Sequence, residues 1–284
     1  MLYETANAPS RIESPANGEP RLDQSAWGVP FRLSASSDAL LDRMQPHLPF
    51  GSTECALTAI DKFATFTLRS IGSEPHYQIL IDDRPLTNAE PLDASLRQLG
   101  SHLTIHVAEY APDYVFIHAG VVAWQDRALL LPGISHAGKS TLVSELVRAG
   151  ATYYSDEFAL LDTSGRVHPF PRTLQMRRPG RHEQSPLPLE QLRGHAGIKP
   201  LPVALIVFTE FAVDACWAPE VLPPGRAALE MLLHAVPAQR TPARVLSTLT
   251  AAMRHATAYR TQRGEAPQVA RTLLAALANK EPLL

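Results

Sequence analysis

The sequence predicts an α/β fold in which buried strands alternate with helices. Residues 114–118 and 128–132 are short apolar runs, as expected of strands that are covered on both faces. The second run leads into a glycine-bounded loop that begins at Gly133, and a helical pattern follows at residues 140–149. Gly150 then stands where a helix commonly ends. A strand, a glycine loop and a helix in this order form the centre of the predicted fold.

Composition and charge limit the classes of protein to which the chain can belong. The 284 residues, 45% of them hydrophobic, suffice for one large domain or for one domain with a smaller appendage. A formal net charge of −2 and a pI of about 6.6 argue against nucleic-acid binding, which favours a strongly basic face. We expect no membrane segment, since no apolar stretch approaches about 20 residues, and no secretory signal, since the first 20 residues lack a basic start followed by an apolar core. The two cysteines, Cys55 and Cys216, fit a cytoplasmic protein without a disulfide framework.

Four regions follow from changes in composition and periodicity. We expect residues 1–26, which are polar and proline-containing, to form a disordered tail. Residues 27–112 are expected to form a small N-terminal α+β subdomain. Residues 113–223 would be the core, with helices that flank its sheet. Residues 224–284 would form a helical C-terminal region that packs on the core.

Within these regions, periodicity and turn residues predict the individual elements. The expected strands are residues 63–68, 77–81, 151–154 and 203–208, with a hairpin of 158–161 and 167–170 and a loop over 178–200. The expected helices begin at Ser37, run over 89–110 with Asn88 as N-cap, run over 227–236, and begin at Thr241. Two apolar stripes are expected in the core: Leu246, Leu249 and Met253, and Val269, Leu273, Leu274 and Leu277.

The central loop fits the pattern G-x-x-x-x-G-K-[ST], which is typical of phosphate-binding P-loops. Its residues are Gly133, Ile134, Ser135, His136, Ala137, Gly138, Lys139 and Ser140. The glycines let several backbone N–H groups face one phosphate chain, at the positive end of the following helix dipole. Lys139 would attract the β- and γ-phosphates, Ser140 would ligate Mg²⁺, and His136 is expected to be a spacer. The strand before the loop and the helix after it favour this interpretation over a chance glycine turn.

An acidic pair follows the loop at the end of the next predicted strand. In an open α/β sheet this position places Asp156 and Glu157 at the carboxyl edge, where ligands bind. One carboxylate could hold Mg²⁺ and the other could take the proton from an attacking hydroxyl. We favour this interpretation of the pair over a solvated strand end without a function. His118 ends an earlier strand, where a histidine is either a core residue or part of the site.

Together these residues resemble the catalytic domain of bacterial HPr kinase/phosphorylase. The resemblance is closer still to the HPr-kinase-related proteins that include the serine kinases of lasso peptides. It rests on Ile117 and His118 in the first strand, the loop, Gly150, and the pair Asp156 and Glu157. It covers roughly residues 114–210 well and the flanking regions weakly.

The resemblance implies a P-loop fold like that of phosphoenolpyruvate carboxykinase, with ATP and Mg²⁺ as cofactors. It implies catalytic roles for Lys139, Asp156, Glu157 and His118, with Glu157 as proton acceptor, and a metal site at Ser140 and Asp156. The nucleotide-binding set that we expect consists of Gly133, Ile134, Ser135, His136, Ala137, Gly138, Lys139, Ser140, Thr141 and Arg172. Because HPr kinases assemble as oligomers, a homo-oligomer is left open.

Two departures from the family pattern limit what carries over. Glutamate stands at position 157, where HPr kinases have aspartate, and one methylene moves the carboxylate by about 1 Å. The base is therefore either Glu157 or Asp156. The downstream family signature, an acidic residue followed by isoleucine–arginine–glycine, is missing, so the phosphorylase activity of the family is not carried over to this chain. Arg172, Arg177 or Arg178 would neutralise the phosphoryl group instead, or would be surface charges.

The leading hypothesis is an ATP- and Mg²⁺-dependent kinase that phosphorylates a hydroxyl, with a serine of a peptide or small protein as acceptor. The acceptor class follows from the resemblance alone. A second hypothesis keeps the kinase but replaces the peptide with a small metabolite. A third is a nucleotide-binding regulatory or scaffold protein with little turnover. No nucleic-acid or membrane partner is expected under any of the three.

Overall fold

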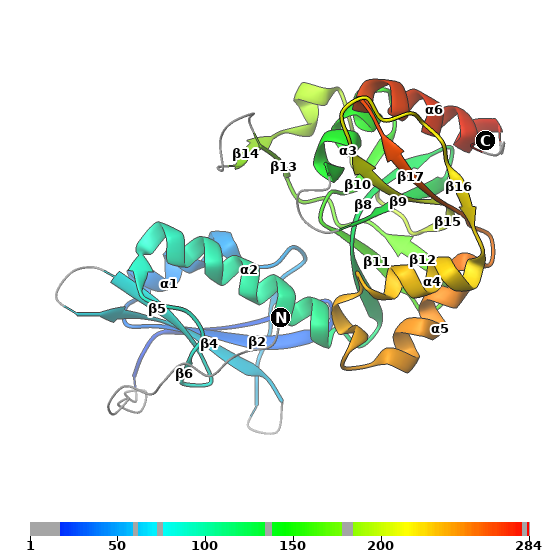
Figure 1. Cartoon of the computed structure of the whole chain (residues 1–284). Helices are drawn as coiled ribbons and strands as arrows, with labels where there is room; N and C mark the ends of the chain where they lie inside the picture. Colours follow the sequence, from blue (N-terminus) through cyan, green and yellow to red (C-terminus); the bar gives the residue numbers. More distant parts are fainter. Residues whose placement is uncertain are drawn as a thin grey trace. The chain divides into compact units, whose positions relative to one another are not determined.

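The computed structural model describes residues 18–58, 62–72, 76–133, 138–177, 184–279 and 283. The chain forms two compact units, Met1–Val107 and Ala108–Leu284, each with its own mixed sheet (Figure 1). The boundary between the units lies inside one long helix. The expected α/β class is confirmed, since the described residues form mixed sheets together with helices.

The N-terminal unit is a mixed sheet with one long helix on it. Its strands are β1 (Arg21–Ala26), β2 (Val29–Ala35), β3 (Thr53–Glu54), β4 (Ala64–Ile71), β5 (His76–Ile81), β6 (Arg84–Pro85) and β7 (Glu90–Pro91). Its helices are α1 (Asp38–Met44), the 3-10 helix η1 (Gln45–His47) and α2 (Leu92–Tyr110). The strand order is β3-β1-β2-β4-β5-β6, with β7 paired to β5. Leu96, Leu99 and Leu103 of α2 are buried, and the helix lies across the sheet (Figure 1).

Two expectations for this unit are wrong. Residues 21–26 were expected in the tail but form β1, because their backbone pairs with β2 along its whole length, from Arg21 with Ser34 to Ala26 with Val29. Asn88 does not cap α2, because the chain first adds the short strand β7 to β5 and the helix begins at Leu92. The helix at Ser37 is confirmed, since its hydroxyl accepts a hydrogen bond from the Leu40 N–H at 3.3 Å.

The second unit carries the predicted loop. Its strands are β8 (Tyr114–Trp124), β9 (Arg127–Pro132), β10 (Thr152–Ser155), β11 (Phe158–Asp162), β12 (Arg166–His168), β13 (Leu174–Arg177), β14 (Gln184–Leu187), β15 (Leu201–Phe211), β16 (Glu220–Leu222) and β17 (Thr257–Arg263). Its helices are α3 (Lys139–Arg148), α4 (Pro224–Leu232), α5 (Pro242–Met253) and α6 (Ala266–Asn279), with 3-10 helices η2 (Leu189–Leu192) and η3 (Val236–Ala238).

Five of the described strands of this sheet run in the same direction, namely β9, β10, β11, β15 and β17, and β11 follows β10 along β8. β9 is parallel to β15, and β15 is parallel to β17. β8 is antiparallel to both β9 and β10, so β10 runs the same way as β9. The carboxyl ends of β9, β10, β15 and β17 therefore lie at one edge, where open α/β sheets bind their ligands.

Helices cover both faces of the sheet. α3 and α6 share one hydrophobic core, and α4 and α5 share the other (Figure 1). The first core contains Leu142, Val143, Leu146, Val269 and Leu273, and the second contains Ala227, Met231, Val245 and Leu249. The sheet is thus the middle of three layers, and α3 is held by burial directly behind the loop.

The C-terminal part of the chain differs from the expected all-helical region. Residues 257–263 form β17, which pairs with β15 inside the sheet and carries polar residues that hide its strand character. β14 and η2 lie within the expected loop 178–200. In α5, Leu246 is 36% exposed and Val245 is buried instead, while the stripe around Leu273 in α6 is confirmed.

The turn between β11 and β12 gives a test of the packing of this unit. Gly165 has φ +80°, and a Cβ there would lie 2.3 Å from the backbone nitrogen of Ala252. We expect Gly165→Ala to lower the free energy of unfolding by about 2–4 kcal/mol, because strain and overpacking add. Urea denaturation measures this value.

Gly225→Ala is the matched control for that substitution. Gly225 lies in α4, and a Cβ there would meet nothing within 4 Å. The free energy of unfolding should stay equal or rise by up to about 1 kcal/mol, since alanine favours helix. Equal destabilisation by both substitutions would contradict the described packing around Gly165.

Candidate functional site

The described residues of the predicted site lie at the carboxyl edge of the second unit's sheet. β9 ends at Pro132 and leads into Gly133, whose N–H donates to the His118 carbonyl oxygen at 3.2 Å. β10 ends at Ser155, so Asp156 follows at the same edge. The direction of the strands thus brings both strand ends to the same part of β8, where the Gly133 N–H donates to the His118 carbonyl oxygen and the Ala119 N–H donates to the Glu157 carbonyl oxygen.

The loop enters α3 through a left-handed glycine. Gly138 has φ +74°, and its carbonyl oxygen accepts the first helical hydrogen bond, from Leu142 at 3.1 Å. The Lys139 Nζ donates to the Gly133 carbonyl oxygen at 2.7 Å, so the side chain folds back across the loop. Thr141 is exposed on the first turn of the helix. Ile134, Ser135, His136 and Ala137 lie outside the described residues.

Asp156 accepts hydrogen bonds from three directions. Ser140 Oγ donates to its Oδ2 at 3.2 Å, and the Gln175 N–H donates to the same oxygen at 3.3 Å. The Tyr153 hydroxyl lies 2.9 Å from Oδ1 and 2.9 Å from the carbonyl oxygen of Arg172, and its single proton serves one of them at a time. Burial raises the pKa of Asp156, and these donors act against the rise. The carboxylate is therefore fixed in orientation.

Glu157 has a different environment from its neighbour. Its carboxylate forms an ion pair with the Arg172 guanidinium, and both side chains are 42% exposed. Partial burial raises the pKa of Glu157, while the positive charge of Arg172 lowers it. Glu157 is thus the more accessible member of the pair, whereas the oxygens of Asp156 are occupied by protein donors.

His118 and His234 lie next to each other through their backbones. The His118 N–H donates to the His234 carbonyl oxygen at 2.8 Å, and the His118 ring contacts Phe158 with centroids 4.7 Å apart. Burial, followed by the positive charge of Lys139, lowers the pKa of both histidines. Among the described hydrogen bonds none joins the His118 and Glu157 side chains, although the Ala119 N–H donates to the Glu157 carbonyl oxygen at 3.2 Å.

Several residues of the site were not predicted. Tyr153 and the Gln175 N–H hold Asp156, His234 adjoins His118, and Arg263 donates to the Gly138 carbonyl oxygen at 2.9 Å. Tyr153 lies within the strand that was predicted, and its position three residues before Asp156 is the one signal that the sequence contains. The others reach the site only through tertiary structure.

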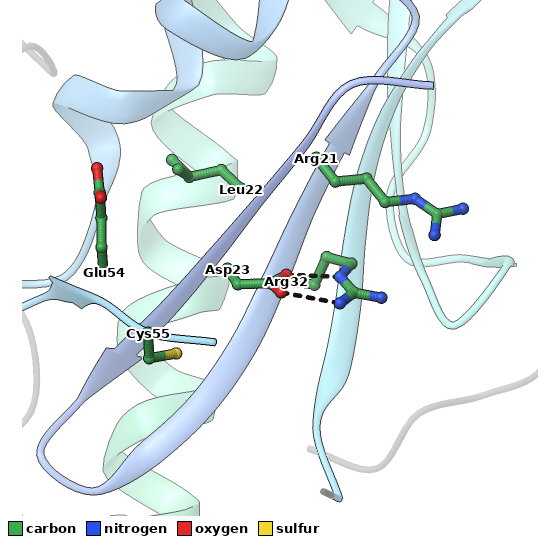
Figure 2. Close-up of a pocket in the computed structure, with 6 residues that line it drawn as sticks. All are labelled: Arg21, Leu22, Asp23, Arg32, Glu54 and Cys55. Carbon is green, nitrogen blue, oxygen red and sulfur yellow. Dashed lines mark hydrogen bonds and ion pairs between the residues drawn. The ribbon is translucent and has the colours of Figure 1, made fainter. Parts of the chain in front are cut away.

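A separate cavity lies in the N-terminal unit, beside β1 and β3. It measures about 310 Å³ and is lined by Arg21, Leu22, Asp23, Arg32, Glu54 and Cys55. Asp23 and Arg32 face each other there and form two hydrogen bonds of 2.6 and 2.9 Å (Figure 2). These two charges neutralise each other, and the lining includes none of the predicted site residues. The candidate site is therefore the sheet edge of the second unit.

No family model matches the chain, and no curated protein matches it either. None of the described helices is both long and apolar enough to cross a membrane. Within the described part of the chain, no three histidine, cysteine, aspartate or glutamate side chains cluster as metal ligands.

The contact between Tyr153 and Asp156 gives a test of the site's geometry. We expect Tyr153→Phe to raise the pKa of Asp156 further, because the hydroxyl stabilises the charged carboxylate. A ¹³C NMR titration of the Asp156 carboxyl carbon measures this value. Tyr154→Phe is the matched control, since the Tyr154 hydroxyl donates to the Lys199 carbonyl oxygen instead. Equal Asp156 titration in the wild type and in Tyr153→Phe would contradict the described contact.

Proposed function

We propose that this protein is an ATP- and Mg²⁺-dependent kinase of the HPr-kinase-related type, with a P-loop fold like that of phosphoenolpyruvate carboxykinase. The observation that carries the proposal is the meeting of Lys139, Ser140, Asp156 and Glu157 at one sheet edge, with Ser140 Oγ 3.2 Å from Asp156. Phosphoryl transfer needs a positive charge, a metal ligand and a base in this arrangement.

The start of α3 would bind the phosphates. Its first N–H groups have no partners within the helix, and the helix dipole is positive at that end. Burial lowers the pKa of Lys139 while Asp156 raises it, so a partly desolvated ammonium group stands beside the phosphate position. Nucleotide phosphates would replace the Gly133 carbonyl oxygen as partners of Lys139.

Ser140 and Asp156 fit a magnesium site. Mg²⁺ prefers oxygen ligands and is commonly held by one or two carboxylates together with substrate phosphates and water. The Ser140 hydroxyl and the Asp156 Oδ2 already lie 3.2 Å apart at the first turn of α3. When bound there, the metal would neutralise charge on the β- and γ-phosphates. The Tyr153 and Gln175 donors would hold the carboxylate in position for this role.

Glu157 is the better candidate for the base. It is 42% exposed and has Arg172 as its ion-pair partner, whereas protein donors occupy both oxygens of Asp156. The acceptor oxygen would attack the γ-phosphorus in line, and its proton would pass to the Glu157 carboxylate. The bond between the γ-phosphorus and the β–γ bridging oxygen would break, and ADP would leave. Arg172, released from Glu157, would stabilise the transferred phosphoryl group.

The acceptor that we propose is a serine of a peptide or small protein. This assignment rests on the resemblance to the HPr-kinase-related proteins and not on a described surface. A small-metabolite acceptor and a nucleotide-binding protein with little turnover are the alternatives, and a product analysis separates the three.

Phosphoryl transfer is tested with purified protein, Mg²⁺-ATP and peptides encoded near its gene, or lysate. We expect a mass gain of 80 Da, the mass of HPO₃, on a peptide serine. Lys139→Ala should abolish this mass gain, because the phosphates lose the positively charged side chain that would bind them. Lys199→Ala is the matched control, since Lys199 forms an exposed ion pair with Asp126. A mass gain on a metabolite would favour the small-metabolite kinase, and ATP binding without any phosphorylated product would favour the nucleotide-binding protein with little turnover.

Substitution of each carboxylate by the isosteric amide distinguishes the roles of Glu157 and Asp156. Glu157→Gln should lower kcat by about 10²–10⁴-fold with ATP affinity nearly unchanged, because the amide cannot accept the proton. Asp156→Asn should instead weaken ATP binding in the presence of Mg²⁺, because a metal ligand loses its charge. Calorimetry and steady-state kinetics measure the two effects. Full activity in Glu157→Gln would exclude this residue as the base.

A further inference from the structure

Arg263, the last residue of β17, lies buried against the start of α3. Its side chain is 2% exposed although it carries a positive charge. The Nη2 group donates to the Gly138 carbonyl oxygen at 2.9 Å, and Nη1 donates to the Gly264 carbonyl oxygen at 3.0 Å. The guanidinium lies over the Phe211 ring, 5.5 Å from its centroid, at the end of β15. Two strand ends thus fix its position.

The hydrogen bond to Gly138 fixes a peptide group that is central to the proposed phosphate site. The Gly138 carbonyl oxygen accepts from both Leu142 N–H and Arg263 Nη2, at 3.1 and 2.9 Å. A trans peptide is planar, so its N–H points opposite to its C=O. With the Gly138 oxygen held from inside the protein, the Lys139 N–H must point out of the helix start, toward an incoming anion.

Gly138 and Arg263 are also matched in size. A Cβ at position 138 would lie 2.4 Å from Arg263 Nη2, and the backbone there has φ +74°. The guanidinium therefore occupies the space that any other side chain at position 138 would need. Glycine at position 138 is therefore favoured by the left-handed backbone and also by the position of the Arg263 guanidinium.

Arg263 has no direct ion-pair partner among the described residues, and the negative charge that acts on it is the carboxylate of Glu265, which offsets part of the cost of its burial. No aspartate or glutamate of the described residues forms an ion pair with it, and its buried Nε lacks a hydrogen-bond partner. A buried charge without a hydrogen-bonded counter-charge is unfavourable, and an anion bound nearby would reduce that cost. The phosphates of a nucleotide at the start of α3 would be such an anion.

We propose that Arg263 is a positioning residue of the phosphate site, which orients the Gly138–Lys139 peptide and places a buried positive charge behind it. This inference rests on the proposed nucleotide binding, and it adds a residue 125 positions after Gly138, outside the loop motif. It predicts that neutralising Arg263 raises the Kd of ATP by more than its effect on the stability of the fold explains.

The test measures the Kd of ATP with Mg²⁺ by calorimetry and the stability by urea denaturation for the same variants. Arg263→Met removes the charge and both donors at similar length, and ATP should bind at least about tenfold more weakly. Arg263→Lys keeps the charge with one donor group, and its affinity should lie between the two. Arg260→Met, on the exposed side of β17, should leave the Kd unchanged.

A purely structural role is excluded with a core variant. Leu273→Ala in α6 removes buried apolar volume from the core and should lower stability with little change in Kd. An equal loss of affinity in Leu273→Ala and Arg263→Met, or an unchanged Kd in Arg263→Met, would overturn the inference. If Arg263→Met does not fold, Arg263→Lys decides, with unchanged affinity as the contradicting result. Failure of the wild type to bind ATP would instead refute the proposed function itself.

Discussion

The hydrogen bond between Ser140 and Asp156 connects the two halves of the candidate site. Ser140 belongs to the first turn of α3, and Asp156 follows β10 at the edge of the sheet. The contact exists because β9 and β10 run in the same direction with β8 between them, so both strand ends arrive at one edge. The chemistry that we propose for Lys139 and Glu157 depends on that arrangement, because Lys139 precedes Ser140 and Glu157 follows Asp156 in the sequence.

Residues around the site hold Asp156 and the Gly138 carbonyl oxygen in fixed positions. Tyr153 and the Gln175 N–H hold Asp156, while Arg263 holds the Gly138 carbonyl oxygen from the end of β17. Groups that are fixed before the ligand arrives need not reorganise during the reaction, which is the condition for electrostatic stabilisation of a phosphoryl group. The same arrangement would allow tight binding with little turnover, so a product analysis is needed to separate a kinase from a binding protein.

The local part of the site could be predicted from the sequence. The apolar run of β9, the loop glycines and the helical pattern of α3 are contiguous, so the positions of Lys139 and Ser140 followed from neighbouring residues alone. Arg263 could not be found in this way, because β17 is a polar strand whose buried positions include an arginine, and only its pairing with β15 brings it to the loop. β1 was likewise assigned to a tail, because a mostly polar segment with Leu22 as its one large apolar residue becomes a strand only by pairing with β2.

The most direct test of the account is a crystal structure with Mn²⁺ and a non-hydrolysable ATP analogue, in which anomalous scattering locates the metal. The account predicts a manganese peak within ligand distance of both the Ser140 hydroxyl and the Asp156 carboxylate, with the analogue's phosphates at the start of α3. A manganese ion bound elsewhere, or an analogue that leaves this edge of the sheet unoccupied, would contradict it.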